Sequence, residues 1–158
     1  MQGMLPSTHS MSSRNQLLAK KFSNLPTLRK TGTTIVGLKY KDGVMLAADT
    51  RATSSIICDK ESIKINYIAP NIYCCGSGGL ADCANVCLLC KSQLELLRRQ
   101  TNKQSRVVSA MTILSSRLFQ YGGNIQAGLI LGGVDSTGVY LYNIWPNGWY
   151  SAPLAVDL

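Results

Sequence analysis

Thr33 is the residue of this sequence whose position best suits nucleophilic chemistry, and it follows Gly32 within the stretch Arg29-Lys-Thr-Gly-Thr-Thr-Ile-Val-Gly37. A threonine hydroxyl attacks a carbonyl only when a base takes its proton. The sequence holds one histidine, His9, so beyond the N-terminal head it can build no Ser-His-Asp, Cys-His or histidine-containing zinc site. Cleavage after Gly32 would supply an amine with a reference pKa of about 8 beside the Thr33 hydroxyl. Gly32, which has no Cβ, lets the peptide adopt a strained conformation open to attack.

Asp49 and Lys64 are the candidates to support such a nucleophile. A lysine ammonium near the hydroxyl lowers the cost of forming the alkoxide, and a carboxylate beside it keeps the lysine charged and oriented. Each residue also has an ordinary explanation: Asp49 as a turn residue at a strand end, and Lys64 as a solvated strand lysine.

A glycine-rich stretch, Gly76-Ser-Gly-Gly-Leu-Ala81, matches the G-x-G-x-x-A pattern of dinucleotide-binding turns. A dinucleotide unit requires a parallel strand after the helix, with an acidic residue at its end. Here a second helix is predicted instead, and Glu95, which has the approximate spacing, lies within a helix. The pattern therefore favours an ordinary strand-to-helix turn.

The spacing of Cys83, Cys87 and Cys90 is C-x3-C-x2-C, which some iron–sulfur enzymes use to hold a cluster. The same three residues fall on one apolar helix stripe, where small buried side chains are expected. We therefore interpret them as core residues. The six cysteines of the sequence, which shows no secretory signal, indicate reduced thiols.

Alternating apolar residues predict a hairpin over 33–49 that turns at Lys41-Asp42-Gly43. A second strand pair is predicted between 55–58 and 64–67, around Asp59-Lys60, and a fifth strand over 72–75 follows the Pro70-Asn71 turn. We expect these five strands to form an antiparallel sheet.

Two apolar stripes with helical spacing follow the predicted strands. The first consists of Leu80, Cys83, Cys87, Cys90, Leu94 and Leu97, and the second of Val107, Met111, Leu114, Leu118 and Tyr121. Strands resume over 126–131 and 139–144, with turns at 135–138 and 146–148. This order predicts an α+β fold with helices packed on a sheet.

The composition indicates a single soluble domain with a sizeable core, because 46% of the 158 residues are apolar. Residues 1–32 hold five basic and no acidic side chains, so the rest of the chain holds eleven basic and eight acidic ones. Because most of the +8 charge lies in residues 1–32, it gives little support to nucleic-acid binding by the folded part. The acid-free head also resembles a mitochondrial transit peptide. No apolar run reaches the roughly 18 residues of a membrane span.

The sequence resembles the catalytic beta subunits of the eukaryotic 20S proteasome, which are N-terminal threonine hydrolases, and within them the trypsin-like class. Six stretches carry this resemblance in order: 29–37, Tyr40-Lys-Asp-Gly43, Ala48-Asp-Thr-Arg-Ala-Thr53, Asp59-Lys60 with Lys64-Ile65, Pro70-Asn-Ile-Tyr-Cys-Cys-Gly76 and Leu131-Gly-Gly-Val-Asp135. The resemblance implies a sandwich of two antiparallel sheets between helix layers. It also implies a location in the cytoplasm and nucleus, assembly with alpha and beta subunits in a stacked-ring core, unfolded or ubiquitin-tagged polypeptides as substrates, and neither cofactor nor metal.

The resemblance also implies a role for each matching residue. Residues 1–32 would be a propeptide, removed autocatalytically between Gly32 and Thr33, and residues 33–158 the hydrolase domain. Thr33 would be the nucleophile, supported by Asp49 and Lys64. The Gly78 N–H would donate to the oxyanion, for which a glycine at a helix N-terminus is physically suited. Thr53 would pair with the substrate backbone, and Gly76 would form the floor of a roomy side-chain pocket.

Two departures from the family pattern bear on activity. Ser54 and Ala84 stand where the trypsin-like class has the acidic residues that bind a basic substrate side chain. The sequence stops before the family's Gly-Ser-Gly segment and later catalytic residues, so we expect a fold incomplete at its C-terminus. The alternative to a threonine endopeptidase is thus a non-catalytic structural or truncated paralogue.

Overall fold

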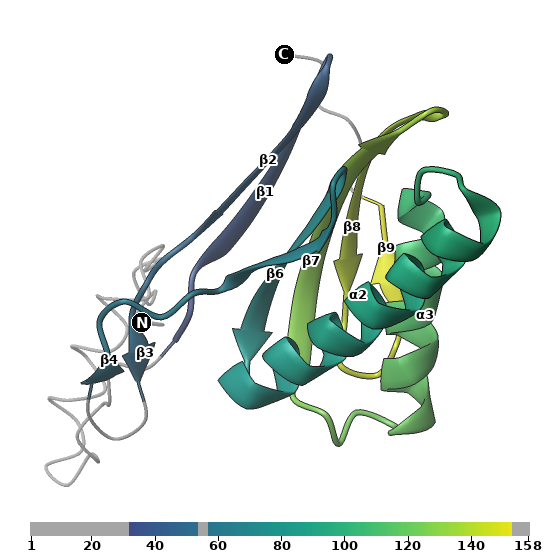
Figure 1. Ribbon diagram of the computed structural model, residues 1–158. Coiled ribbons are helices and arrows are strands. Elements are labelled where there is room, and N and C mark those ends of the chain that lie inside the picture. Colours follow the sequence, from purple (N-terminus) through teal and green to yellow (C-terminus); the bar gives the residue numbers. More distant parts are fainter. Residues whose placement is uncertain (1–31, 54–56, 153–158) are drawn as a thin grey trace, which may run out of the picture. The chain divides into compact units, whose positions relative to one another are not determined.

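The computed structural model of the chain describes residues 32–53 and 57–152, so that the predicted propeptide, except Gly32, and residue Ser54 lie outside the described part. The fold is α+β, as the sequence predicts (Figure 1). Its elements are β1 (Ile35–Tyr40), β2 (Gly43–Ala48), β3 (Ala52–Thr53), β4 (Ile57–Asp59), β5 (Ile65–Ala69), β6 (Ile72–Gly78), α2 (Leu80–Thr101), α3 (Val107–Gln120), β7 (Ala127–Asp135), β8 (Gly138–Ile144) and β9 (Tyr150–Ser151).

The first two strands form the predicted hairpin. β1 and β2 pair antiparallel from Tyr40↔Gly43 to Ile35↔Ala48, and the two residues between them, Lys41 and Asp42, make the turn. An Asp-Gly step between alternating apolar runs favours this geometry. The hairpin brings the residue before β1 next to the residue after β2, which decides the position of the functional site.

The remaining strands pair differently from the prediction. β5 pairs antiparallel with β6 through the Pro70-Asn71 turn, and β4 pairs with β3 rather than with β5. The prediction that 55–58 pairs with 64–67 is therefore wrong. A two-residue turn closes the β5–β6 pair with little loss of loop entropy, and this favours it over the longer connection from β4.

The largest sheet has five antiparallel strands in the order β5-β6-β7-β8-β9. Helices α2 and α3 cover one face, and the β1–β2 hairpin lies on the other (Figure 1). Gly37 and Gly132 allow the hairpin to approach, because a Cβ on Gly37 would lie 2.8 Å from Leu141 and one on Gly132 would lie 3.2 Å from Leu46. Two β layers and one helix layer are thus present, consistent with an N-terminal nucleophile hydrolase sandwich.

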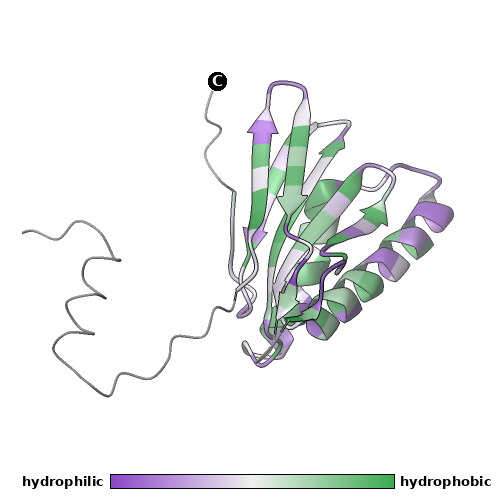
Figure 2. Ribbon diagram, turned by 90° about the vertical axis from the view of Figure 1, so that its left-hand side faces the viewer, coloured by the Kyte–Doolittle hydropathy of each residue, from purple (hydrophilic) through white to green (hydrophobic). Residues whose placement is uncertain are grey.

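The helix stripes point into the core, but their ends do not. Leu80 and Leu97 of α2 and Tyr121 after α3 are exposed, whereas Val86 and Ala110 complete the buried stripes. Figure 2 shows a hydrophilic colour at the C-terminal end of α2, which holds Arg98 and Arg99. Neither described helix is long and apolar enough to cross a membrane.

The three cysteines with iron–sulfur spacing lie in the core between α2 and the sheet. Cys83, Cys87 and Cys90 expose 3%, 2% and 0% of their surface, and burial raises the pKa of Cys90 to about 12. Burial also raises the pKa of Cys83 to about 11, whereas a hydrogen bond with Cys74 lowers the pKa of Cys87. Thiols that stay protonated, as at Cys83 and Cys90, are poor metal ligands. The interpretation of these residues as core residues is confirmed by their burial.

Leu131 of β7 tests how much this core contributes to stability, because its side chain is fully buried beneath the helices. We expect Leu131→Ala to lower the free energy of unfolding by about 3 kcal/mol, since it removes apolar contact and leaves a cavity. Urea denaturation followed by circular dichroism measures the change. Leu96→Ala is the matched control, because Leu96 is 69% exposed and its truncation should change stability by less than about 0.5 kcal/mol.

Candidate active site

The β1–β2 hairpin brings Thr33 close to Asp49, although sixteen positions separate them in the numbering. Two hydrogen bonds close the open end of the hairpin: the Asp49 N–H donates to the Thr34 carbonyl at 3.1 Å, and the Thr34 N–H donates to Asp49 Oδ1 at 2.9 Å. Thr33 therefore sits on a backbone held from both strands. Its hydroxyl has a defined position rather than that of a loose chain end.

Lys64 completes the constellation from a different element, the segment just before β5. Its Nζ donates to Thr33 Oγ1 at 3.0 Å, to Asp49 Oδ1 at 2.9 Å and to the Arg51 carbonyl at 2.7 Å. An ammonium group has three N–H donors, so each one has an acceptor. The Lys64 side chain is only 3% exposed, which keeps its charge in a fixed place and poorly screened by water.

The contact with Lys64 is the main reason that the pKa of Asp49 lies below its ordinary value of 3.8, and the Thr34 N–H lowers it further. Asp49 is thus an anion at neutral pH. The backbone of Lys64 is held as well, because the Gly76 N–H donates to its carbonyl at 3.0 Å. The ion pair is therefore anchored to both sheets.

This electrostatic coupling predicts a pH dependence. Because folding lowers the Asp49 pKa, the ion pair stabilises the fold above the unfolded value of about 3.9 and ceases to do so as the pH falls through the folded value. In Lys64→Met, an NMR titration of the Asp49 carboxyl should show a higher pKa, still reduced by the Thr34 N–H. Lys60→Met, which removes an exposed lysine, should leave the titration unchanged; equal curves for both variants would contradict this prediction.

A cavity of about 350 Å³ opens beside Thr33. Several residues to which the sequence assigned functions line it together, and the full set is Gly32, Thr33, Ala52, Thr53, Lys64, Gly76, Gly78, Gly79, Leu80 and Cys83. Residues from β3, β6 and the start of α2 thus converge on the hydroxyl.

Gly78 lies where β6 ends, and its backbone conformation requires glycine. Its φ is +108°, and a side chain there would collide with the carbonyl oxygen of Gln126. N–H groups two residues apart on a strand point to the same edge. Because the Gly76 N–H points to Lys64, the Gly78 N–H points to the same edge, beyond the start of β5, where the cavity lies.

Gly32 also has a conformation that other residues rarely adopt. Its φ is +139°, and no atom lies within 4 Å of where a Cβ would be. The requirement for glycine there is thus one of backbone conformation and not of space.

The sequence did not identify every residue at this site. The sequence did not predict the Arg51 carbonyl as a site group, because every residue has a main-chain carbonyl and the residue type gives no signal for its use. Leu80 and Cys83 were interpreted only as helix-stripe residues, yet both also line the cavity. Ala84 is exposed on α2 and lines a different cavity, with Ile63 and Lys91 among its neighbours.

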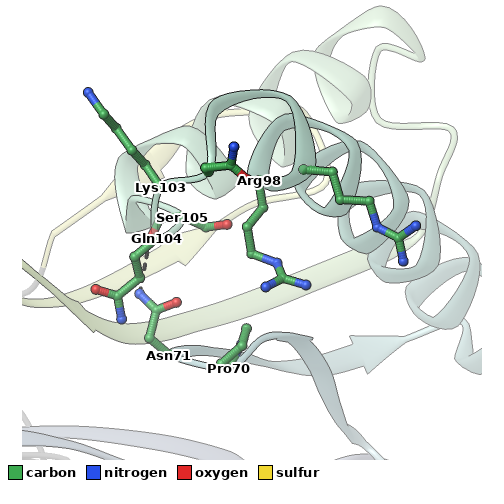
Figure 3. A pocket seen from close by; sticks show the side chains of 8 residues that line it. Pro70, Asn71, Arg98, Lys103, Gln104 and Ser105 are labelled. Carbon is green, nitrogen blue, oxygen red and sulfur yellow. Dashed lines mark hydrogen bonds between the residues drawn. The ribbon is translucent and has the colours of Figure 1, made fainter.

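A second cavity, of about 380 Å³, lies between the end of α2 and the β5–β6 turn (Figure 3). Asn71 donates to the Ser105 carbonyl at 2.9 Å, and Arg98 is paired with Glu95 at 2.9 Å. In Figure 3 the Lys103 side chain points away from Ser105. This cavity therefore lacks the contact between an amine and a hydroxyl that distinguishes the cavity at Thr33.

Comparison with known proteins connects this geometry to a family. Residues 29–156 match the family described as Proteasome subunit. The chain is 54% identical over 136 residues to proteasome subunit beta type-7-B of Arabidopsis thaliana, and 48% identical over 128 residues to beta type-10 of Rattus norvegicus. It is 45% identical over 136 residues to beta type-2 of Saccharomyces cerevisiae. These alignments cover 85%, 80% and 85% of the chain, and 50%, 47% and 52% of the relatives, so the chain spans about half the length of the relatives it matches.

Proposed function

The chain belongs to the proteasome subunit family, and on that premise we propose that it is a core beta subunit acting as a threonine endopeptidase. Its substrates would be unfolded, ubiquitin-tagged polypeptides, and its nucleophile Thr33 would be released by self-cleavage. The observation that carries this proposal is the 3.0 Å contact of Lys64 Nζ with Thr33 Oγ1, together with the 2.9 Å contact of Lys64 with Asp49.

Self-cleavage would begin with attack of Thr33 Oγ on the carbonyl carbon of Gly32. The carbon–nitrogen bond breaks, the hydroxyl proton passes to the departing amine, and an ester joins Gly32 to the Thr33 oxygen. Water then hydrolyses the ester. The φ of +139° at Gly32 supports this step, since it bends the backbone before Thr33 in a way that a residue with a Cβ would resist.

The freed amine would then act as the base for substrate hydrolysis. It takes the Thr33 proton while Oγ attacks the scissile carbonyl, and the Lys64 ammonium stabilises negative charge on Oγ. The Gly78 N–H, directed to the cavity, would donate to the oxyanion. The amine returns its proton to the leaving group, and water releases the acyl group from Thr33.

The proposal includes partners and a location: other alpha and beta subunits of a stacked-ring core, in the cytoplasm and nucleus. The outward face of the β1–β2 hairpin supports further packing, because Val36, Leu38, Tyr40 and Met45 are 52%, 44%, 50% and 61% exposed. The same face is compatible with a structural subunit that does not cleave peptides. The two alternatives differ in whether Thr33 becomes an N-terminus.

Mass spectrometry of the chain isolated from assembled core particles tests the proposal. We expect a species that begins at Thr33. Thr34→Ala is the matched control: it removes the neighbouring hydroxyl but keeps the N–H that binds Asp49, so the chain should still begin at Thr33. A chain recovered only with residues 1–32 attached would instead support the structural role.

A further inference from the structure

The two helices carry the net positive charge of the described part of the chain. Residues 80–121 hold six basic and two acidic side chains, whereas the other described residues hold five of each. Three of the six basic side chains, Arg98, Arg99 and Lys103, line the cavity of about 380 Å³ at the C-terminal end of α2 (Figure 3). The charge of the helix layer is thus concentrated at this end.

Hydrogen bonds hold the walls of this cavity in place. Asn71, in the β5–β6 turn, donates from Nδ2 to the Ser105 carbonyl at 2.9 Å and to the Val134 carbonyl at 2.7 Å. The Val134 N–H donates back to the Asn71 carbonyl at 3.1 Å, and the Val107 N–H donates to Asp135 Oδ2 at 3.0 Å. The turn, the segment after α2 and the end of β7 are therefore joined before any ligand binds, which reduces the entropy cost of binding.

Two guanidinium groups share one carboxylate at this cavity. Arg98 donates to Glu95 from Nε and Nη2, and Arg99 donates to it from Nε, which lowers the pKa of Glu95 to about 2. The Arg99 Nη groups and Lys103 Nζ have no acceptor among the described residues. Since the end of a helix contributes only roughly half a negative charge, three cations exceed the anionic groups by roughly one and a half charges. This excess is available to an anion from outside.

The backbone at the same end offers hydrogen-bond acceptors. Helix carbonyls point towards the C-terminal end, and those of the last turn have no N–H partner within the helix. The Asn102 N–H donates to the Arg98 carbonyl at 2.9 Å, whereas within the described part of the chain no main-chain N–H is bonded to the carbonyls of residues 99–101. A ligand with an anionic group and N–H donors would therefore match both features of this end of α2.

We propose that this cavity binds an acidic peptide segment of a partner protein, with a glutamate or aspartate carboxylate on the basic side chains and main-chain N–H groups on the carbonyls that end α2. Phosphate groups match it less well, because they bring no N–H and are favoured at helix N-termini, where the dipole has the opposite sign. Nucleic acid matches it less well too, since its binding depends on many phosphate contacts and the described residues outside the helices sum to zero charge.

This site is separate from the cavity beside Thr33. The two cavities share no lining residue, and Leu80 and Arg98 lie roughly 27 Å apart along α2. The inference therefore does not depend on the proposed function, and its test needs no measurement of peptide hydrolysis.

Fluorescence anisotropy with the purified full chain tests the binding. The probe is a labelled octapeptide of alternating glutamate and glycine, and the matched peptide has glutamine in place of each glutamate. At physiological ionic strength we expect the glutamate peptide to bind at least about tenfold more tightly, because charge-assisted hydrogen bonds are stronger than neutral ones. Equal affinities for the two peptides would overturn the inference.

Arg98→Gln and Arg106→Gln test whether the binding belongs to the cavity. Both variants remove one positive charge from an exposed arginine, but Arg106, which precedes α3, does not line the cavity. Arg98→Gln should weaken binding of the glutamate peptide by about tenfold, and Arg106→Gln by less than about twofold, since a charge without contact is screened by salt. Equal losses would indicate attraction by overall charge and would contradict the site.

Three further probes identify the class of ligand without any variant. In the first, esters replace the amides of the glutamate peptide, and the loss of the N–H donors should weaken binding by at least about threefold. Inorganic phosphate and a short single-stranded oligonucleotide should each displace the labelled peptide less well than the unlabelled glutamate peptide at the same concentration. Unchanged binding of the ester peptide, or equal displacement by either phosphate probe, would show that the ligand is not an acidic peptide.

Discussion

Thr33→Ala is expected to reduce covalent labelling of this chain by a peptide electrophile, and its share of peptide hydrolysis, by at least about a thousandfold. Alanine removes the oxygen that Lys64 contacts at 3.0 Å and leaves the backbone of β1 unchanged. The Thr34 N–H still binds Asp49, so the hairpin keeps its closed end. The variant therefore tests the chemistry and not the fold.

Thr33→Ser is the matched variant, because serine keeps the hydroxyl and can still provide an N-terminal amine. It should retain part of the labelling, with a lower rate since the lost methyl group leaves χ1 less restricted. Intact-mass measurement after labelling shows both outcomes. Undiminished labelling of Thr33→Ala would place the reactive group elsewhere in the chain.

Lys64→Met is expected to have the second largest effect, a decrease of at least about a hundredfold in the turnover of this chain. The methionine keeps an unbranched apolar stem in a site where the Lys64 side chain is 3% exposed. What it loses is the positive charge next to Thr33 Oγ1. With the charge gone, an alkoxide or a polarised hydroxyl at Thr33 is no longer stabilised.

The structural cost of Lys64→Met should be smaller than its effect on turnover. Asp49 loses its cation, but 32% of its side chain is exposed to water and it keeps the Thr34 N–H. Lys64→Arg should not rescue activity, because a planar guanidinium cannot reproduce three tetrahedral contacts in this space. A small loss of thermal stability with strongly reduced turnover is the expected combination; unchanged turnover in Lys64→Met would exclude its role.

Much of the fold could be predicted because the signals are local. The Asp42-Gly43 step favours a turn whatever surrounds it, and the spacing from Cys83 to Leu94 defines a helix face from the periodicity of the backbone alone. At the ends of the stripes the prediction was wrong, because it too used only local spacing. Leu80 and Leu97 have the right spacing, but whether they are covered depends on where the sheet ends.

Strand pairing was predicted less well because one strand can have more than one possible pairing partner. Ile65 begins a strand that could pair with the preceding or the following segment, and both choices satisfy its alternation. The short Pro70-Asn71 turn and the seven-residue length of β6 favour pairing of β5 with β6. Neither the pairing of β3 with β4 nor the strand β9 is evident from residue types.

The amino-acid sequence by itself determined the kind of chemistry available. Its one histidine, His9, lies within residues 1–32, and Thr33 follows a glycine, so an N-terminal amine is the natural base. Tertiary structure alone decided that Lys64, thirty-one residues from Thr33, reaches its hydroxyl, and that the Arg51 carbonyl fills the third position on the ammonium. It also decided that Cys83 both packs in the core and lines the cavity beside Thr33. The physical reason is that residue type sets what a group can donate, accept or attack, whereas the packing of distant segments sets which groups meet.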